Sequence, residues 1–319
     1  MNKLRIGLSV AAVVGVTNAA ACDYCLISQG ISPLLVQNGA GLKIAQRYTR
    51  LDDVYEGTNK VDNPGVKEEY WATELSGFYG FSDRFLVLVN VPVRKTRGDG
   101  ELVEGPDGEL ESEKMTGGAT GVGDLSVLGR YTVFSHHTLD ASTLLAGVFG
   151  LKFPTGSTNR HSDQGEYLDA HLQLGTGSTD LLLGMSANHT LGRYAVSANL
   201  LASITGEGET GDMRHRFGNS LNYDVTGKYR IAPTAIGQAS NELFLSLGVN
   251  GDYRRREKLD GETVPDSGGH TIYLTPGVQY LAGTHWVLEG TWQYAVYHDL
   301  HETQLGENYR VVASATYLF

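Results

Sequence analysis

The C-terminal stretch, residues 309–319, alternates between two kinds of side chain, and this alternation constrains the fold more than any other feature of the chain. One face carries only apolar or aromatic side chains, and the other face is mostly small or polar. A period of two is typical of a β-strand with one apolar face. A strand of about ten residues with aromatic side chains at both ends of its apolar face has the pattern of a strand that crosses a membrane.

The end of this stretch also resembles the signal by which bacterial outer-membrane barrels are recognised for assembly. That signal is an aromatic C-terminal residue with apolar residues at every second position before it, and Phe319 and Tyr317 occupy the last two of these positions. We therefore expect outer-membrane lipid and the barrel assembly machinery to be partners of the chain.

The same alternation recurs from about residue 41 to residue 319, in about twelve segments whose connections are alternately short and long. Residues 82–84 and 282–284 are short connections, whereas residues 98–121 form a long acidic loop. Transmembrane barrels have short periplasmic turns and longer outer loops, and a soluble sandwich would show no such rhythm. The sequence predicts an all-β fold, a transmembrane antiparallel barrel of about twelve strands over residues 41–319, in which 309–319 closes the barrel against the first strand.

The N-terminus has the features of a signal peptide over residues 1–21. Lys3 and Arg5 supply positive charge, residues 6–16 are apolar, and residues 17–21 are mostly small. Export to the outer membrane of a Gram-negative cell envelope follows. Residues 22–40 have no clear period and are expected to form a short non-barrel segment, either loose in the periplasm or folded into the barrel as a plug.

Cys22 and Cys25 are the only cysteines, and they lie at the predicted mature N-terminus. Exported chains meet an oxidising compartment, so a short-loop disulfide is one interpretation. Lipid attachment at Cys22 and binding of a soft metal ion such as copper(I) are two others. Haem attachment is excluded because Leu26, and not a histidine, follows the second cysteine.

Composition excludes several classes of function. The formal net charge of −11 argues against a nucleic-acid partner, because phosphate binding needs a basic face. Beyond the N-terminus there is no apolar run long enough for a spanning helix. The sequence has no His–Glu spacing of a zinc enzyme and no nucleophile elbow, so we predict no enzymatic activity and no cofactor other than a metal at the cysteine pair. The acidic loop lacks the calcium-loop spacing and is expected to be solvated.

Charged side chains on the second face of the predicted strands form the candidate pore lining. An Arg or Lys that faces lipid at mid-depth costs about 2–4 kcal/mol, so these residues are expected to face inward. Two interpretations remain open: the charges pair with one another across a narrow lumen, or they form a lining that selects a solute. The candidates are Lys43, Arg47, Glu74, Arg94, Asp124, Arg130, Lys152, Asp180, Asp224, Lys228, Asp252, Arg254, Glu289 and Arg310.

A central part of the chain resembles a known family. The segments KFPTG (152–156), LQLGTGSTD (172–180) and LLLG (181–184), with Gly192-Arg193 near the following turn, are similar to outer-membrane transporters grouped as the meta-pathway phenol-degradation family. The likeness is good over about residues 145–206 and architectural elsewhere. It implies a barrel that passes small solutes passively, hydrophobic ones included, but it fixes no substrate. The cysteine pair departs from the family pattern.

The sequence therefore favours an outer-membrane channel or porin for passive passage of small solutes, hydrophobic or aromatic ones among them. The alternative is a barrel that serves as an anchor or scaffold, whose periplasmic Cys22–Cys25 end binds a metal or a redox partner.

Overall fold

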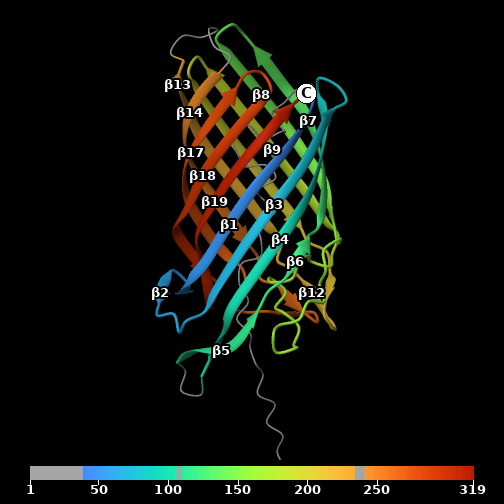
Figure 1. Ribbon diagram of the computed structural model, residues 1–319, viewed down its shortest axis with the longest axis vertical. Coiled ribbons are helices and arrows are strands. Elements are labelled where there is room, and N and C mark those ends of the chain that lie inside the picture. The colour runs from blue at the N-terminus through green and yellow to red at the C-terminus, as the bar shows by residue number, and fades with distance from the viewer. Residues whose placement is uncertain (1–38, 106–108, 234–240) are drawn as a thin grey trace, which may run out of the picture.

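The computed structural model describes residues 39–105, 109–233 and 241–319, and within them twelve long strands close into one antiparallel barrel (Figure 1). The predicted fold is thus confirmed. The described residues include no helix long and apolar enough to cross a membrane. The barrel strands are β1 (Ala40–Glu56), β3 (Lys67–Gly80), β4 (Phe85–Glu104), β7 (Leu125–His137), β8 (Ala141–Phe153), β9 (Asp180–Leu191), β10 (Tyr194–Ile204), β13 (Ser220–Ala232), β14 (Asn241–Arg254), β17 (Gly269–Ala282), β18 (Trp286–Leu300) and β19 (Thr303–Leu318).

The last strand closes the barrel against the first, as the sequence predicts. β19 pairs with β1 in a register that places Gly41 opposite Leu318, and the Phe319 amide donates a hydrogen bond of 2.9 Å to the Ala40 carbonyl. A side chain at position 41 would have its Cβ 2.3 Å from the Phe78 ring and 2.6 Å from the Tyr317 carbonyl oxygen. Only glycine therefore fits at this point of the closing seam.

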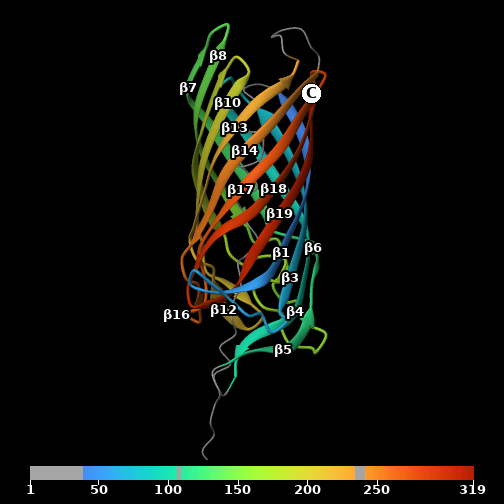
Figure 2. The ribbon, with the colours of Figure 1, turned by 90° about the vertical axis from the view of Figure 1, so that its left-hand side faces the viewer.

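The two ends of the barrel differ as the rhythm of connections predicts. One end carries short turns, such as residues 138–140 and 192–193, together with the C-terminus. The other end carries the long connections and their short strands (Figures 1 and 2). These are β2 (Asn59–Val61), β5 (Leu110–Gly117), β6 (Thr120–Val122), β11 (Gly208–Thr210), β12 (Met213–Arg216), β15 (Lys258–Leu259) and β16 (Glu262–Thr263).

The acidic stretch 98–121 is not a structureless loop, and on this point the sequence prediction is wrong. β4 continues to Glu104 and pairs with β5, so that Glu101 lies opposite Glu113. A hairpin that extends beyond the membrane has no lipid-facing side, so it leaves no membrane-strand pattern in the sequence, even though Leu102 packs into a buried cluster.

The outer wall of the barrel is apolar between two belts of aromatic side chains. Alternate residues of the strands, such as Leu42, Ile44 and Leu247, are exposed. An exposed apolar wall on a closed barrel fits the hydrocarbon core of a membrane, and the aromatic belts fit its two interfaces. The belt at the turn end contains Tyr79, Phe81, Trp286 and Tyr317, and the belt at the loop end contains Tyr48, Trp71, Trp292, Tyr294 and Tyr309.

Leu247→Arg tests which face of the wall meets lipid. Leu247 lies in the middle of β14 with its side chain on the outer face, 57% exposed. An arginine at mid-depth on the lipid face is expected to lower the free energy of unfolding by about 2–4 kcal/mol. Reversible urea unfolding in lipid vesicles measures this change. Met213→Arg, on an exposed short strand at the loop end, is the control and should have little effect. Equal effects of the two variants would contradict the assigned lipid face.

Candidate pore lining and outer mouth

None of the predicted lining residues is exposed on the outer wall. Lys43, Arg47, Glu74, Asp124, Arg130, Lys152, Asp180, Asp224, Glu289 and Arg310 are buried, and Arg94, Lys228, Asp252 and Arg254 are half-buried. Charges that are neither in lipid nor in bulk water need partners, because an isolated buried charge is costly.

Several of the predicted lining residues pair with one another. The Lys43 ammonium lies 3.7 Å from Glu289, across β19, and Arg47 lies 3.1 Å from Glu74 on the neighbouring strand. Lys152 and Asp180 are register partners on β8 and β9, with 2.5 Å between Nζ and Oδ2, and both are almost fully buried. These contacts accord with the first of the two interpretations, in which inward charges neutralise one another.

Arg310 stands at the centre of the largest of these charge groups. Its guanidinium contacts the Glu307 carboxylate through two nitrogens, lies 3.4 Å from Asp252 and lies 4.5 Å from the centre of the Tyr273 ring. Glu307 is absent from the predicted lining, because the last strand was predicted to begin at residue 309. In a regular strand, moreover, residues three apart point to opposite faces. An irregular register between β19 and β1 brings both side chains inside.

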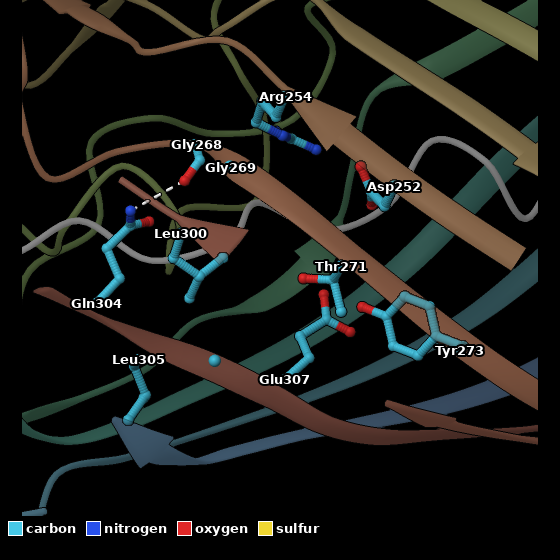
Figure 3. A pocket seen from close by; sticks show the side chains of 11 residues that line it. Asp252, Arg254, Gly268, Gly269, Thr271, Tyr273, Leu300, Gln304, Leu305 and Glu307 are labelled. Carbon is cyan, nitrogen blue, oxygen red and sulfur yellow. Dashed lines mark hydrogen bonds between the residues drawn. The ribbon is translucent and has the colours of Figure 1, made fainter. Parts of the chain in front are cut away.

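A small pocket opens beside this group on the inner wall of β14, β17 and β19 (Figure 3). Its free volume is about 30 Å3, room for about two water molecules. Asp252, Thr271, Tyr273 and Glu307 line it, and the Gln304 amide closes one side with a 2.9 Å hydrogen bond to the Gly268 carbonyl.

Asp124 joins the two motifs that carry the family resemblance. Its carboxylate accepts hydrogen bonds from the Gly156 amide (2.9 Å) and from the amide and hydroxyl of Thr176 (both 2.8 Å). A Cβ on Gly156 would lie 2.6 Å from Gly175 Cα, so the two motifs touch backbone to backbone. The motif glycines thus permit a close contact that fixes both ends of the connection between β8 and β9.

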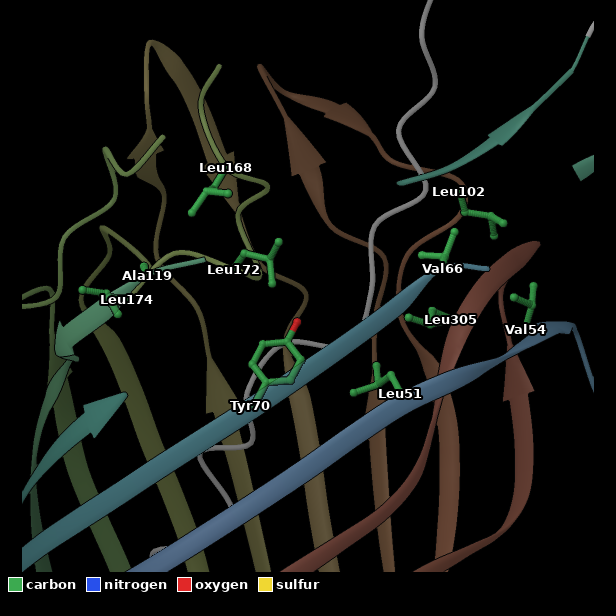
Figure 4. Packing of buried hydrophobic residues seen from close by; sticks show 10 residues of the cluster. All are labelled: Leu51, Val54, Val66, Tyr70, Leu102, Ala119, Leu168, Leu172, Leu174 and Leu305. Atoms are coloured by element: carbon green, nitrogen blue, oxygen red, sulfur yellow. The ribbon is translucent and has the colours of Figure 1, made fainter. Parts of the chain in front are cut away.

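That connection, residues 154–179, is called the mouth loop here, because it folds into the loop end of the barrel. Its carbonyls at Leu172 and Leu174 accept hydrogen bonds from Thr96 (2.6 Å) and Arg94 (3.1 Å) of β4. Its leucines enter a cluster with inward residues of β1 and β3 (Figure 4). The members are Leu51, Val54, Val66, Tyr70, Leu102, Ala119, Leu168, Leu172, Leu174 and Leu305. The mouth loop therefore closes part of the outer mouth.

An apolar stripe crosses the inner wall deeper in the barrel, on β3, β4 and β7–β10. Its residues are Phe78, Leu86, Leu88, Leu128, Val148, Leu182 and Leu201, all buried. The strands on the remaining side contribute mostly charged and amide side chains, such as Asp224, Gln279 and Glu289. The inner wall thus carries one apolar stripe among polar side chains, and Arg130, Lys152 and Asp180 lie on the same strands as the stripe. This stripe was not predicted, because the inner face was expected to be non-apolar. The run Phe85–Val89, apolar on both faces, was a usable signal.

A second feature missed from the sequence is a buried group of three side chains from three connections. His171 of the mouth loop and His215 of β12 both contact the Glu257 carboxylate, at 3.3 and 2.9 Å. Burial raises the pKa of Glu257, but the two imidazoles lower it by more, so it is well below its ordinary value. Burial lowers the pKa of His171, but Glu257, Asp169 and Glu68 raise it by more.

The metal prediction and the N-terminal predictions are not tested by the described residues. No group of three or more His, Cys, Asp or Glu side chains suited to a metal ion occurs among residues 39–105, 109–233 and 241–319. The signal peptide, the Cys22–Cys25 pair and residues 22–38 of the predicted non-barrel segment lie outside the described residues, and they stay predictions, whereas Ala40 is the first residue of β1. The same holds for recognition of Tyr317 and Phe319 by the assembly machinery.

Comparison with known proteins extends these observations. Residues 56–310 match the family described as "Putative MetA-pathway of phenol degradation". An outer-membrane channel from Pseudomonas putida F1 has a similar structure, with a TM-score of 0.65 and 18% sequence identity over 89% of this chain and 97% of that one. This likeness concerns the fold.

Two weaker likenesses cover about the same share of the chain. The CymD monoaromatic hydrocarbon channel has a TM-score of 0.41 and 9% identity over 90% of each chain. A FadL homologue of Pseudomonas aeruginosa has the same TM-score and identity over 92% of this chain and 93% of that one. Likenesses this weak carry no functional argument.

Proposed function

Because the chain belongs to the family described as "Putative MetA-pathway of phenol degradation" and forms a closed outer-membrane barrel, we propose that it is a channel for passive diffusion of small solutes, aromatic ones among them. The chemistry is transport alone, without a catalytic step. The solute moves between the outer mouth and the turn end along the inner wall.

The apolar stripe on the inner wall, which lies among polar inward side chains, supports an aromatic solute. An aromatic ring gains free energy against the apolar stripe at about 25 cal/mol per Å2 of apolar surface removed from water. A polar substituent on the same solute meets the side of Asp224, Gln279 and Glu289. Small ligand sites combine an apolar wall with a few polar groups in this way, and the polar groups orient the ligand.

Permeability ratios of two permanently charged cations test the proposal. Benzyltrimethylammonium and choline are both quaternary ammonium ions that cross lipid poorly, and the benzyl compound is the larger one. If the apolar stripe contacts the ring, the reversal potential between the two salts in a planar bilayer gives a higher permeability for benzyltrimethylammonium. A ratio set by size alone, with choline the more permeant ion, would contradict the aromatic preference.

Leu128→Asn is the matched variant for this measurement. Leu128 is fully buried in the apolar stripe on β7, and asparagine has the same branching of side-chain heavy atoms, with a polar amide in place of the two methyl groups. We expect the preference for the benzyl cation to fall towards unity in this variant. Thr132→Asn, at an inward position of the same strand outside the stripe, is the control and should keep the ratio of the parent protein.

A further inference from the structure

Three outer connections meet at one carboxylate. His171 comes from the mouth loop, His215 from the connection between β10 and β13, and Glu257 from the connection after β14. Each carboxylate oxygen of Glu257 has one imidazole, His171 Nε2 at 3.3 Å from Oε1 and His215 Nε2 at 2.9 Å from Oε2. The Phe217 ring meets both imidazoles edge to face, with ring centres 5.4 and 4.4 Å apart.

Glu257 is itself fixed in its own connection. Its amide donates a 2.9 Å hydrogen bond to the Ser267 hydroxyl, and its carbonyl accepts one of 3.0 Å from the Val264 amide. The backbone of Glu257 is therefore fixed within its own connection. Charge-assisted hydrogen bonds are roughly twice as strong as neutral ones, and burial increases the difference.

The mouth loop is fastened on two sides of the barrel mouth. On the side of β1, β3 and β4, Leu168, Leu172 and Leu174 pack into the apolar cluster. On the side of β12 and β14, His171 reaches Glu257. Loss of the His171–Glu257 contact would remove one attachment of a loop that is also held by packing, by the Thr96 and Arg94 hydrogen bonds, and by backbone hydrogen bonds that join Asp163 to Thr116 and Gly211 to Thr158 (both 3.0 Å).

The charged groups around His171 come from each neighbouring element. Asp169 lies on the mouth loop, and Glu68 lies on β3, where it accepts a 2.5 Å hydrogen bond from the Tyr70 hydroxyl. Asp266 precedes the anchor residue Ser267, and burial raises its pKa. Burial, together with repulsion from Asp169, Glu113, Glu166 and Glu68, raises the pKa of Glu101 on the β4–β5 hairpin to about 7.

As the pH rises, deprotonation of His171 and of Glu101 weakens the attachment of the mouth loop. A histidine with a raised pKa stabilises the folded loop fully below its ordinary pKa, and that stabilisation is lost as the pH passes the raised value. Glu257, with its lowered pKa, stays ionised until the solution is strongly acidic. Glu101 becomes negative near neutral pH and adds repulsion beside Asp169. Alkaline solution therefore weakens the attachment of the loop.

We propose that His171, His215 and Glu257 form a proton-dependent latch that holds the mouth loop closed while His171 is protonated and releases it as His171 loses its proton at higher pH. The role of the latch in gating rests on the proposed channel function, whereas its effect on the loop does not. For this reason the test has one readout from the loop and one from the pore.

The loop readout is amide hydrogen exchange of the whole protein at pH 6.5, compared between the parent and Glu257→Gln. At one pH the intrinsic exchange rates are equal, so a difference reports loop opening. The amides of Leu168 and Leu174, bonded to the Arg160 and Ser157 carbonyls, are expected to exchange about tenfold faster or more in the variant, because the variant removes one partner of the buried ion pair with His171. His189→Gln, at the opposite end of the barrel, is the control. Unchanged exchange in Glu257→Gln overturns the latch.

The pore readout is conductance at pH 6.5 and pH 9. We expect the parent to conduct several-fold better at pH 9, and Glu257→Gln to conduct equally well at both. His171→Gln, which keeps a hydrogen-bond donor but no positive charge, should also lose the pH response, and it serves if Glu257→Gln does not assemble. A pH response retained in both variants overturns the latch. Faster loop exchange without any conductance supports the latch and instead contradicts the channel.

Discussion

Replacing residues 160–172 by two glycines is expected to raise the conductance of the barrel several-fold at neutral pH and to abolish its dependence on pH. The replacement removes Leu168 and Leu172 from the apolar cluster and removes His171 from Glu257. Apolar constrictions stop ion flow by excluding water, so an outer mouth without these leucines should stay wet. The ends of the replaced segment are close, because the Leu174 amide bonds the Ser157 carbonyl at 3.0 Å.

Single-channel recording in planar bilayers measures this effect. Removing residues 58–60, which are exposed and include the first two residues of β2, is the control for a shortened outer connection, and it should leave the conductance unchanged. Correct assembly of each variant is checked by the heat-dependent shift in gel mobility that folded barrels show. An assembled loop variant with the conductance of the parent would mean that the mouth loop does not limit passage.

Asp180→Leu is expected to lower the free energy of unfolding by about 3–5 kcal/mol, the typical cost when one partner of a buried ion pair is removed. Asp180 is completely buried and faces the Lys152 ammonium at 2.5 Å. It also accepts hydrogen bonds from the Ser178 hydroxyl (2.7 Å) and the Gly206 amide (3.0 Å). The substitution removes the carboxylate that faces the Lys152 ammonium. It also removes the acceptor of the Gly206 amide hydrogen bond, at the start of the connection between β10 and β13.

The double variant Lys152→Met with Asp180→Leu separates charge from packing. Replacement of a whole buried pair by apolar residues is often neutral, so the double variant should recover most of the stability. Glu207→Leu, in the exposed pair with Arg214 (3.6 Å), is the control and should change stability by about 1 kcal/mol or less. Urea unfolding in lipid vesicles measures all three variants. If Asp180→Leu alone were as stable as Glu207→Leu, the result would contradict a buried ion pair between Lys152 and Asp180.

The architecture was predictable from the sequence because lipid imposes a strict rule on one face of every strand. An outward position in the hydrocarbon core must be apolar, which produces the alternation in stretches such as 309–319. The same rule identified the inward charges, since Lys152 and Asp180 have no other tolerable place. It also predicted the seam between β1 and β19.

The inner wall follows no such rule, and this is where the sequence analysis was incomplete. An inward position accepts either polarity, so Leu88, Leu128 and Leu182 left no alternation to recognise. The latch depends on packing between loops: His171, His215 and Glu257 lie more than forty residues apart in sequence and have no common period. Glu307 depends on an irregularity of register that local pattern does not predict.

Conductance of the purified loop-shortened barrel in planar bilayers tests the central claim most directly. The account predicts discrete conductance steps at neutral pH and a higher permeability for benzyltrimethylammonium than for choline. A correctly assembled loop-shortened barrel that conducts at no pH between 6.5 and 9 would contradict the channel.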